Sequence, residues 1–400
     1  MPPADAPATP FRAVIMGSDL GVYSLARSFH EAYGTTSVVV AQDTRGPIVN
    51  SAIIDPVYTG TDSGAAELVA ALLRIAEENP GVALVLLAGG EDHLDMIEEN
   101  RALLEAHYLL PYPDGAVLRR ARDKRGLYEA CAQLGLPFPA IAEVEVSSLR
   151  RDPVAGSCVV TLPAGLSFPV AVKPANSGEW SHLSFPGKKK AYYVPDAAEL
   201  TRVLTAVADG GYNDQMLIQE FVPGDDTWGR TVTCYVASNG EVTMAASGVL
   251  LLGMHTPSMI GNSVAILTTP QPQLCDQVAT LVAHLGLRGF VNVDLKVDPR
   301  DGVARFLDLN ARAGRPNHYA LLAGLNPARA VVEDLVQGNP RRLTASTVSV
   351  FSYLPRWFLV RYVTDPELRR SVRASWPGAA AHPLVYRADQ PCRPAAFRGA

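Results

Sequence analysis

The stretch GFVNVDLKVDPRDGVARFLDLNARAGR, residues 289–315, decides the fold prediction. Apolar residues recur on both sides of the turn-forming sequence DPRDG, residues 298–302, so the stretch predicts two β-strands joined by a tight turn. Asp294 lies on the first strand, whereas Asp308 and Asn310 lie on the second, two apart and therefore on one face. Two acids and an amide on one side of a hairpin form an all-oxygen site, which suits Mg²⁺ bridging phosphates.

Arg312 follows this hairpin directly. Its guanidinium would offer a fixed cation to a transferring phosphoryl group or to a carboxylate. The alternative for each of these residues is an ordinary polar sheet face with hairpin charges. Because all four occur together in mostly apolar strands, the pattern favours a functional site.

The composition limits the class of protein. A length of 400 residues predicts two or three domains, and 48% apolar with 19% charged residues provides ample core-forming material. A net charge of −5 argues against a nucleic-acid binder that neutralises phosphates. The five cysteines are scattered and form no C-x-x-C pair, which favours neither a disulfide framework nor a zinc site and suits the cytoplasm. The N-terminus lacks a signal-peptide pattern, and no apolar run reaches the length of a membrane span.

The N-terminal part alternates short buried strands with amphipathic helices. After a Pro- and Ala-rich leader at 1–10, expected to be disordered, strands are predicted at 13–16, 37–41 and 82–87, and helices at 22–33 and 67–78. This order predicts an α/β domain at 11–117 with a parallel sheet. Ligands of such sheets bind beyond the carboxyl ends of the strands, where the loops 17–21 and 89–93 lie. Ser18 in the first loop is a candidate substrate residue, although a plain tight turn explains that loop equally simply.

A different pattern begins near Leu118. Helices are predicted from 122 to about 135 and at 276–285, strands at 169–174 and 217–224, and hairpins at 231–249 and 289–310. Strands and hairpins dominate, so we expect an α+β domain at 118–340, followed by a C-terminal extension at 341–400.

Four short motifs occur in a fixed order within this second domain. They are an Asp-Lys pair that opens a helix (Asp123, Lys124), a strand ending in VKP (172–174), a strand reading QEFVPG (219–224), and the acidic hairpin. This order resembles the ATP-grasp fold from about residue 118 to 337, and the preceding unit resembles the preATP-grasp α/β domain. The segment GSDLGVYSLARSFHEAYGTTSVVV, residues 17–40, further resembles the D-aspartate ligase branch of carboxylate–amine ligases.

The resemblance implies roles for residues around ATP. Lys124 and Lys173 would contact the phosphates, where a lysine serves as a mobile point charge, and Lys173 would also be catalytic. The adenine and ribose would be contacted by Gln219, by the backbone of Glu220 and Val222, and by Asp226.

The resemblance also implies a Mg²⁺ site and a lid. Asp294, Asp308 and Asn310 would hold the metal, with Arg312 as the catalytic arginine near the reacting phosphate. The family commonly has Glu-x-Asn where this chain has Asp308-x-Asn310, one methylene shorter. The loop at 177–190 matches the lid over the triphosphate, but it is poor in glycine and contains Trp180, His182 and Phe185.

The implied activity is an ATP-dependent carboxylate–amine ligase that forms an amide through an acyl phosphate. The cofactors would be ATP and Mg²⁺, and the partners a small-molecule carboxylate and an amine. Arg315, Asn317 and His318 follow the hairpin, where a substrate carboxylate could bind. The narrow expectation is D-aspartate joined to a lysine amine of a peptidoglycan precursor.

Several alternatives remain open at this point. The chain could be a ligase of another amino acid or of a natural-product acid, or a non-catalytic nucleotide-binding protein on the same fold. The segment PRWFLVRY, residues 355–362, could associate with a membrane surface, although a buried strand or helix explains the same residues.

Overall fold

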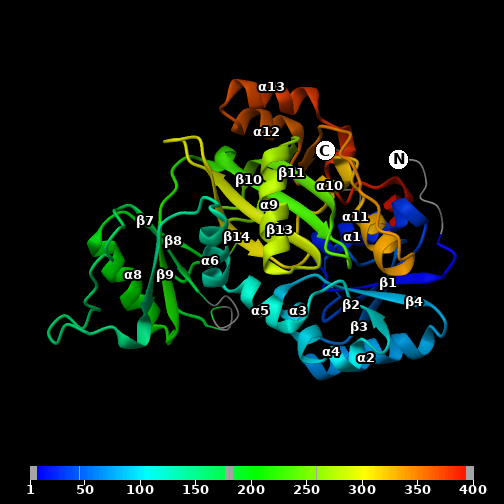
Figure 1. The fold of residues 1–400 in the computed structure, drawn as a ribbon, viewed down its shortest axis with the longest axis horizontal. Helices are drawn as coiled ribbons and strands as arrows, with labels where there is room; N and C mark the ends of the chain where they lie inside the picture. Colours follow the sequence, from blue (N-terminus) through cyan, green and yellow to red (C-terminus); the bar gives the residue numbers. More distant parts are fainter. Residues whose placement is uncertain (1–6, 45, 176–179, 181–182, 258, 393–400) are drawn as a thin grey trace.

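The computed structural model describes residues 7–44, 46–175, 180, 183–257 and 259–392. These residues form a five-stranded parallel sheet, a four-stranded antiparallel sheet and a six-stranded antiparallel sheet. Figure 1 shows the parallel sheet at the lower right, the four-stranded sheet at the left and the six-stranded sheet between them. The predicted fold class, an α/β N-terminal domain followed by an α+β domain, is confirmed, whereas the domain boundaries stay predictions.

The parallel sheet has the order β3-β2-β1-β4-β5. Its strands are β1 (Phe11–Met16), β2 (Ser37–Ala41), β3 (Ile54–Tyr58), β4 (Ala83–Ala88) and β5 (Tyr108–Leu109). From β1 the chain moves outward to β2 and β3, then returns to place β4 on the other side of β1. The direction of winding therefore changes between β1 and β4.

Helices cover both faces of this sheet. They are α1 (Leu20–Tyr33), α2 (Ala65–Glu78), α3 (Glu91–Glu99) and α4 (Arg101–Leu104). Successive residues of a strand point to opposite faces. Ile15 accordingly shares a hydrophobic cluster with α1, whereas Val14 shares one with α2 and α3. Helix α1 begins where the Asp19 carboxylate accepts hydrogen bonds from the N–H groups of Gly21 and Val22.

The six-stranded sheet has the order β14-β13-β10-β11-β12-β15. Its strands are β10 (Gly229–Val236), β11 (Val242–Gly253), β12 (Ser263–Thr268), β13 (Gly289–Val297), β14 (Ala304–Asn310) and β15 (Val350–Ser352). All neighbouring pairs are antiparallel, including the two hairpins expected from the sequence. The helices and helical turns of this part are η2 (Asp226–Trp228), α9 (Pro272–Leu285), α10 (His318–Leu322), α11 (Pro327–Val331) and the π-helical turn η3 (Val332–Val336).

The turn between β13 and β14 is fixed by a buried carboxylate. Asp298 accepts a hydrogen bond from the Arg300 N–H at 2.9 Å and lies 3.2 Å from the Arg305 guanidinium. Its own N–H donates to the carbonyl oxygen of Val303. These contacts hold the register next to the turn, up to the pairing of Leu295 with Phe306. A bulge at Leu307 then shifts the register, so that Asp294 pairs with Asp308.

The four-stranded sheet has the order β6-β9-β7-β8 and its own hydrophobic cluster. Its elements are β6 (Ile141–Glu145), η1 (Val146–Ser148), β7 (Val170–Pro174), β8 (Tyr192–Val194), α8 (Ala197–Asp209) and β9 (Gln215–Glu220). Two helices, α5 (Gly115–Arg122) and α6 (Lys124–Leu134), connect it to the parallel sheet. The other two main clusters instead each combine residues of the parallel sheet with residues of the six-stranded sheet.

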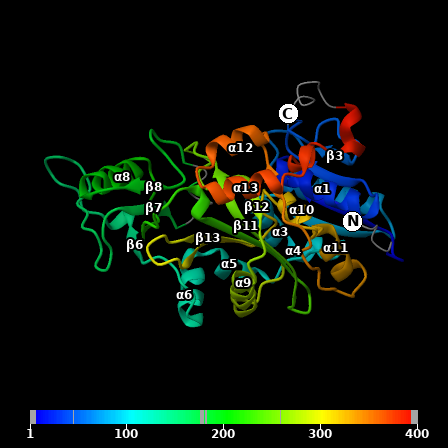
Figure 2. The same ribbon diagram turned by 90° about the horizontal axis from the view of Figure 1, so that it is seen from above.

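The C-terminal region covers the β12–β15 end of the six-stranded sheet with its first two helices and then lies beside α1, where Arg27 donates to the Pro383 carbonyl oxygen (Figure 2). It contains α12 (Arg356–Tyr362), α13 (Pro366–Ala374), η4 (Gly378–Ala381) and η5 (Arg387–Cys392). Helix α12 buries Leu359 against the sheet and leaves Trp357 exposed. No helix in the described part of the chain combines the length and the apolar character that crossing a bilayer requires.

Candidate active site

A cavity of about 750 Å³ lies between the four-stranded and six-stranded sheets. Its walls bring together eight of the residues expected to bind ATP or metal: Lys124, Lys173, Gln219, Glu220, Val222, Asp226, Asp294 and Asp308. These residues come from five separate segments of the chain. The motifs that are spread along the sequence therefore lie around one cavity in the fold.

The two aspartates of the hairpin face each other across β13 and β14. Asp294 pairs with Asp308 in the strand register, and Asn292 pairs with Asn310. The predicted face of Asp294, Asp308 and Asn310 is therefore the face on which these four residues meet. The Nζ atom of Lys124, at the first position of α6, lies 3.4 Å from Asp308 Oδ1.

The two carboxyl groups have opposite pKa shifts. Burial and the neighbouring charge of Asp308 raise the pKa of Asp294 to about 6. Burial also acts to raise the pKa of Asp308, but the charges of the nearby lysines outweigh it, and the pKa of this carboxyl lies below its usual value. The lysines thus favour the charged form of Asp308, whereas burial and the charge of Asp308 disfavour the charged form of Asp294.

Lys173 is half-buried near the end of β7. Its Nζ atom lies 3.3 Å from the carbonyl oxygen of Leu307 and 3.5 Å from the Tyr128 hydroxyl. Burial and the positive charge of Lys124 lower the pKa of Lys173 to about 7. A bound anion would restore the charge of this amine, as expected of a group that contacts phosphate.

Gln219 is held at the back of the cavity by a residue that the sequence did not indicate. The Tyr128 hydroxyl, on α6, lies 3.2 Å from Gln219 Oε1 and 3.0 Å from the Leu307 carbonyl oxygen. Tyr128 therefore connects the residue predicted to face adenine with Lys173, which is predicted to face phosphate. Apolar side chains, among them Ala171, Leu250 and Leu307, complete this part of the wall and suit a flat base.

Asp226, the predicted ribose residue, sits at the start of η2. Its Oδ2 atom accepts a hydrogen bond from the Gly253 N–H at 2.8 Å and lies 2.9 Å from His255 Nε2. Lys296 lines the same cavity and donates to the Gly224 carbonyl oxygen at 2.7 Å. Lys296 was not predicted as a site residue, although it lies two residues after Asp294 and therefore on the same face of β13.

The predicted lid at 177–190 is only partly within the described residues, and His182 lies outside them. The Trp180 side chain is buried and packs edge-on against Tyr212, Phe185 and Tyr192. Trp180, one of the aromatic residues by which this stretch departs from the family pattern, is thus anchored in the core of the four-stranded sheet. Lys188, Lys189 and Lys190 line the cavity beside it.

The donor set suits Mg²⁺ shared with phosphates. Within the described ranges, no three His, Cys, Asp or Glu side chains gather closely enough to hold a metal ion by themselves. Two carboxylates and an amide would leave coordination positions for phosphate oxygens and water, which Mg²⁺ commonly retains. Asn292, buried beside them, donates from Nδ2 to Asp294 Oδ1 at 3.1 Å and keeps that carboxylate in place.

Two arginines after β14 connect the hairpin to the N-terminal domain. Arg312 Nε lies 2.9 Å from Glu91 Oε1 at the start of α3, and Arg315 Nε lies 3.4 Å from Asp19 Oδ2 before α1. Neither arginine lines the large cavity. Their predicted contacts with phosphate and substrate carboxylate stay predictions, as does the role of Asn310.

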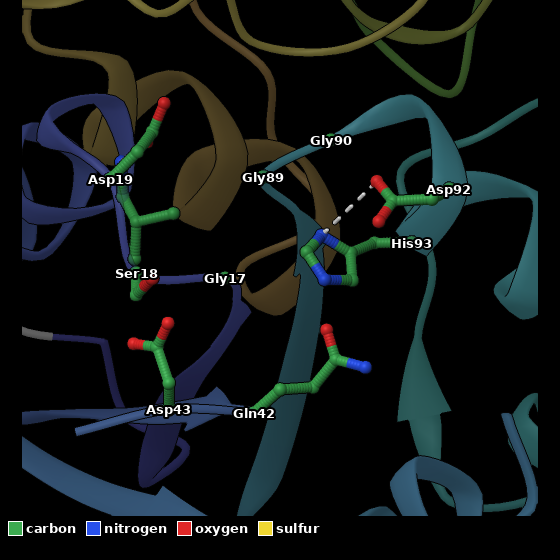
Figure 3. Close-up of a pocket in the computed structure, with 10 residues that line it drawn as sticks. Gly17, Ser18, Asp19, Gln42, Asp43, Gly89, Gly90, Asp92 and His93 are labelled. Carbon is green, nitrogen blue, oxygen red and sulfur yellow. Dashed lines mark hydrogen bonds and ion pairs between the residues drawn. The ribbon is translucent and has the colours of Figure 1, made fainter. Parts of the chain in front are cut away.

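The remaining predicted substrate residues lie away from the large cavity. Asn317 is buried and donates to the carbonyl oxygens of Gly21 and Gly314, while His318 is buried 3.1 Å from the Ala380 carbonyl oxygen. Burial lowers the pKa of His318 to about 3. Both side chains thus have packing contacts, and their predicted contact with a substrate stays a prediction. Ser18 lines a second, smaller cavity (Figure 3).

The chain is similar to a curated ligase. It is 34% identical over 334 residues to the D-aspartate ligase of Enterococcus faecium strain Aus0004, covering 82% of this chain and 78% of that protein. A comparison with models of known protein families finds no match.

Solved structures share the fold at low sequence identity. An L-amino acid ligase from Bacillus licheniformis aligns with a TM-score of 0.55 and 16% identity, over 82% of this chain and 75% of that one. N5-carboxyaminoimidazole synthetase from Staphylococcus aureus, complexed with ADP, aligns with a TM-score of 0.59 and 12% identity, over 88% and 85%. The biotin carboxylase domain of Hydrogenobacter thermophilus 2-oxoglutarate carboxylase, with MgADP, aligns with a TM-score of 0.60 and 14% identity, over 85% and 74%.

Proposed function

Because the chain belongs to the D-aspartate ligase family of ATP-grasp carboxylate–amine ligases, we propose that it joins D-aspartate to the lysine amine of a peptidoglycan precursor. The chain is an ATP-dependent ligase that forms carbon–nitrogen bonds. One observation supports binding of the nucleotide in the large cavity. Lys124, Lys173, Asp294 and Asp308 all line this cavity, which lies between two antiparallel sheets.

In the proposed reaction, a substrate carboxylate oxygen attacks the γ-phosphorus of ATP, and ADP leaves. The acyl phosphate that forms is attacked by the amine, and inorganic phosphate leaves as the amide is made. The amine must lose its proton before or during this second step. Neither step needs a covalent bond to the protein, so positioning and charge neutralisation provide the acceleration.

Residues of the cavity have separate tasks in this scheme. Lys124 and Lys173 neutralise phosphate oxygens, and the amine of Lys173 regains its proton as the anion binds. Asp294, Asp308 and Asn310 would hold Mg²⁺, which supplies charge stabilisation at the transferred phosphoryl group. Arg312 orients the carboxylate and the phosphoryl group before transfer.

Water must be kept from the acyl phosphate, because hydrolysis would waste ATP. Lys188, Lys189 and Lys190 line the cavity, and Trp180, which also lines it, packs in the core of the four-stranded sheet. We infer that the four-stranded sheet and these three lysines close over the nucleotide together.

The test is ADP release with MgATP across a panel of D- and L-amino acids, each with and without a lysine-bearing peptidoglycan precursor. Release that requires D-aspartate and the precursor supports the proposal. Release that requires another acid or amine keeps the ligase class and rejects the cell-wall assignment. ATP binding without turnover on any pair would favour a nucleotide-binding role.

A further inference from the structure

The N-terminal domain contains a second cavity, of about 230 Å³, that shares no lining residue with the large one. Figure 3 shows the side chains that surround it. The lining residues come from the loops after β1, β2 and β4 and from the first turns of α1 and α3: Gly17, Ser18, Asp19, Val22, Gln42, Asp43, Gly89, Gly90, Asp92 and His93. A volume below that of drug-sized pockets, roughly 300–1,000 Å³, suits one small polar molecule.

This cavity lies at the point where the parallel sheet changes its winding direction. Strands β1 and β4 are neighbours, but α1 follows β1 onto one face of the sheet and α3 follows β4 onto the other. The two loops therefore diverge and leave a crevice beyond the strand ends, which is where open α/β sheets bind ligands.

The backbone around the crevice requires glycine. A Cβ atom on Gly89 would lie 2.3 Å from the Met16 carbonyl oxygen, and Gly17 has a φ of +107°. Larger residues would push the two loops apart or fill the space between them. Gly17 and Gly89, at the ends of the closely spaced strands β1 and β4, therefore form part of the cavity wall.

The lining favours a cationic group. Asp19, Asp43 and Asp92 contribute carboxylates, and among the described lining residues there is no lysine or arginine. Burial lowers the pKa of His93, which disfavours a positive charge on its ring. His93 Nδ1 is buried and lies 3.8 Å from Asp92 Oδ1, beyond hydrogen-bond distance, and the dashed line in Figure 3 marks this contact. An ammonium group would meet several acceptors here.

Two arginines border the cavity on the side of the β13–β14 hairpin. Arg315 forms an ion pair with Asp19, and Arg312 forms one with Glu91, which directly precedes Asp92. Both arginines follow β14, whose last residue is Asn310. A ligand that extends from the cavity toward the hairpin would thus have its cationic end among carboxylates and its anionic end near guanidinium groups.

We propose that this cavity binds the protonated α-amino group of the amino-acid substrate, while Arg312 and Arg315 hold its carboxylates near the phosphoryl group. The proposal rests on the function proposed above and specifies how the acid is selected. It predicts that the enzyme distinguishes an amino acid from the same acid without its amino group. The lysine amine of the acceptor would bind elsewhere, because it has to reach the acyl phosphate in its neutral form.

The experiment compares D-aspartate with succinate, which lacks only the amino group. Steady-state ADP release is measured for the wild type, Asp43→Asn, Asp92→Asn and the control Asp62→Asn, an exposed aspartate of the same domain outside the cavity. We expect the KM for D-aspartate to rise about tenfold or more in Asp43→Asn and Asp92→Asn, as for a lost charge-assisted hydrogen bond. The KM values for ATP and for the acceptor should not change, and the preference over succinate should shrink.

Other outcomes overturn the proposal. An unchanged KM for D-aspartate in both variants rejects the cavity as the ammonium site, and a rise only in the acceptor KM assigns it to the amine substrate. If another amino acid supports turnover instead, D-aspartate is rejected as the substrate, and the same comparison is made with that acid and its desamino analogue. If calorimetry with the ATP-loaded wild type detects binding of no amino acid, both proposals fail. Thermal melting of each variant confirms that it is folded.

Discussion

Asp294 and Asp308 stand directly opposite each other on β13 and β14, so two carboxylates face each other across one antiparallel pair. Like charges in this position destabilise a sheet. Lys124 compensates the charge of Asp308, whereas Asp294 accepts a hydrogen bond from the neutral amide of Asn292. The hairpin thus holds an unfavourable charge pair at the place where the family resemblance implies a divalent cation.

Replacing Asp294 by Asn should stabilise the protein and inactivate it. The pKa of Asp294 is raised to about 6, so its ionised form opposes folding above pH 6, and this cost disappears as the carboxyl becomes protonated at lower pH. We expect Asp294→Asn to raise the free energy of unfolding by about 0.5–1 kcal/mol at pH 8 and by much less at pH 4. Turnover should fall roughly 10²-fold or more. Urea unfolding at both pH values measures the change in the free energy of unfolding, and an ADP-release assay measures turnover. A variant that is less stable than the wild type at pH 8 would contradict the prediction.

ATP binding should be accompanied by proton uptake at Lys173. The pKa of this amine is lowered to about 7, so much of it is neutral at pH 8, and a polyanion favours the charged form. Binding should weaken as the pH rises above 7, by up to about tenfold per pH unit for one proton. Calorimetry in buffers of different ionisation enthalpy counts the protons. The control Lys173→Arg stays charged and should bind without this uptake; equal uptake in both proteins would refute the assignment.

Arg312→Ala should slow the chemical step with little effect on nucleotide binding. Arg312 does not line the large cavity, and its partner Glu91 belongs to the N-terminal domain. Loss of one preorganised charge predicts a decrease of roughly 10²-fold in kcat with a nearly constant KM for ATP. Arg373→Ala, on the exposed surface of α13, is the matched control. Normal ADP release by Arg312→Ala would remove this residue from the mechanism.

Tyr128→Phe should weaken ATP binding without affecting the acid substrate. The hydroxyl contacts Gln219, Lys173 and the Leu307 carbonyl oxygen, so its removal disturbs the predicted adenine and phosphate contacts together. A loss of about 1 kcal/mol corresponds to roughly a fivefold weaker affinity. Tyr108→Phe serves as the control, since that hydroxyl donates to the Leu72 carbonyl oxygen in the N-terminal domain. Fluorescence titration with a nucleotide analogue distinguishes the two; equal effects would indicate a general loss of stability.

The sequence predicted the elements whose pattern is local. The alternation at 289–310 predicted the β13–β14 hairpin and the shared face of Asp308 and Asn310, because side chains two apart on a strand point the same way. The pairing of Asp294 with Asp308 also depends on a bulge at Leu307, which the sequence pattern did not indicate. The apolar runs of β1, β2 and β4 were also predicted, since buried parallel strands are continuous apolar segments. Strand β3 was missed because it lies at the sheet edge and contains Asp55 and Pro56.

The parts of the site that were missed depend on packing between distant segments. Tyr128 reaches Gln219 and Leu307 only after α6 packs beside both antiparallel sheets, and nothing near Tyr128 in the sequence marks this. Asp43 follows β2, whereas Asp92 and His93 follow β4, and they meet only because these two strands lie on either side of β1. Strand order is a tertiary property, so the loop positions could be predicted but not the cavity that they enclose.

The separate hydrophobic cluster of the four-stranded sheet has a consequence for unfolding. That cluster is distinct from the two that join the parallel and six-stranded sheets, and the large cavity lies on the boundary. Amide hydrogens of β7, β8 and β9 can therefore exchange with solvent through a sub-global opening that leaves the rest of the molecule intact. A nucleotide touching both walls would merge these two cooperative units into one, so that its dissociation becomes the first event in denaturation.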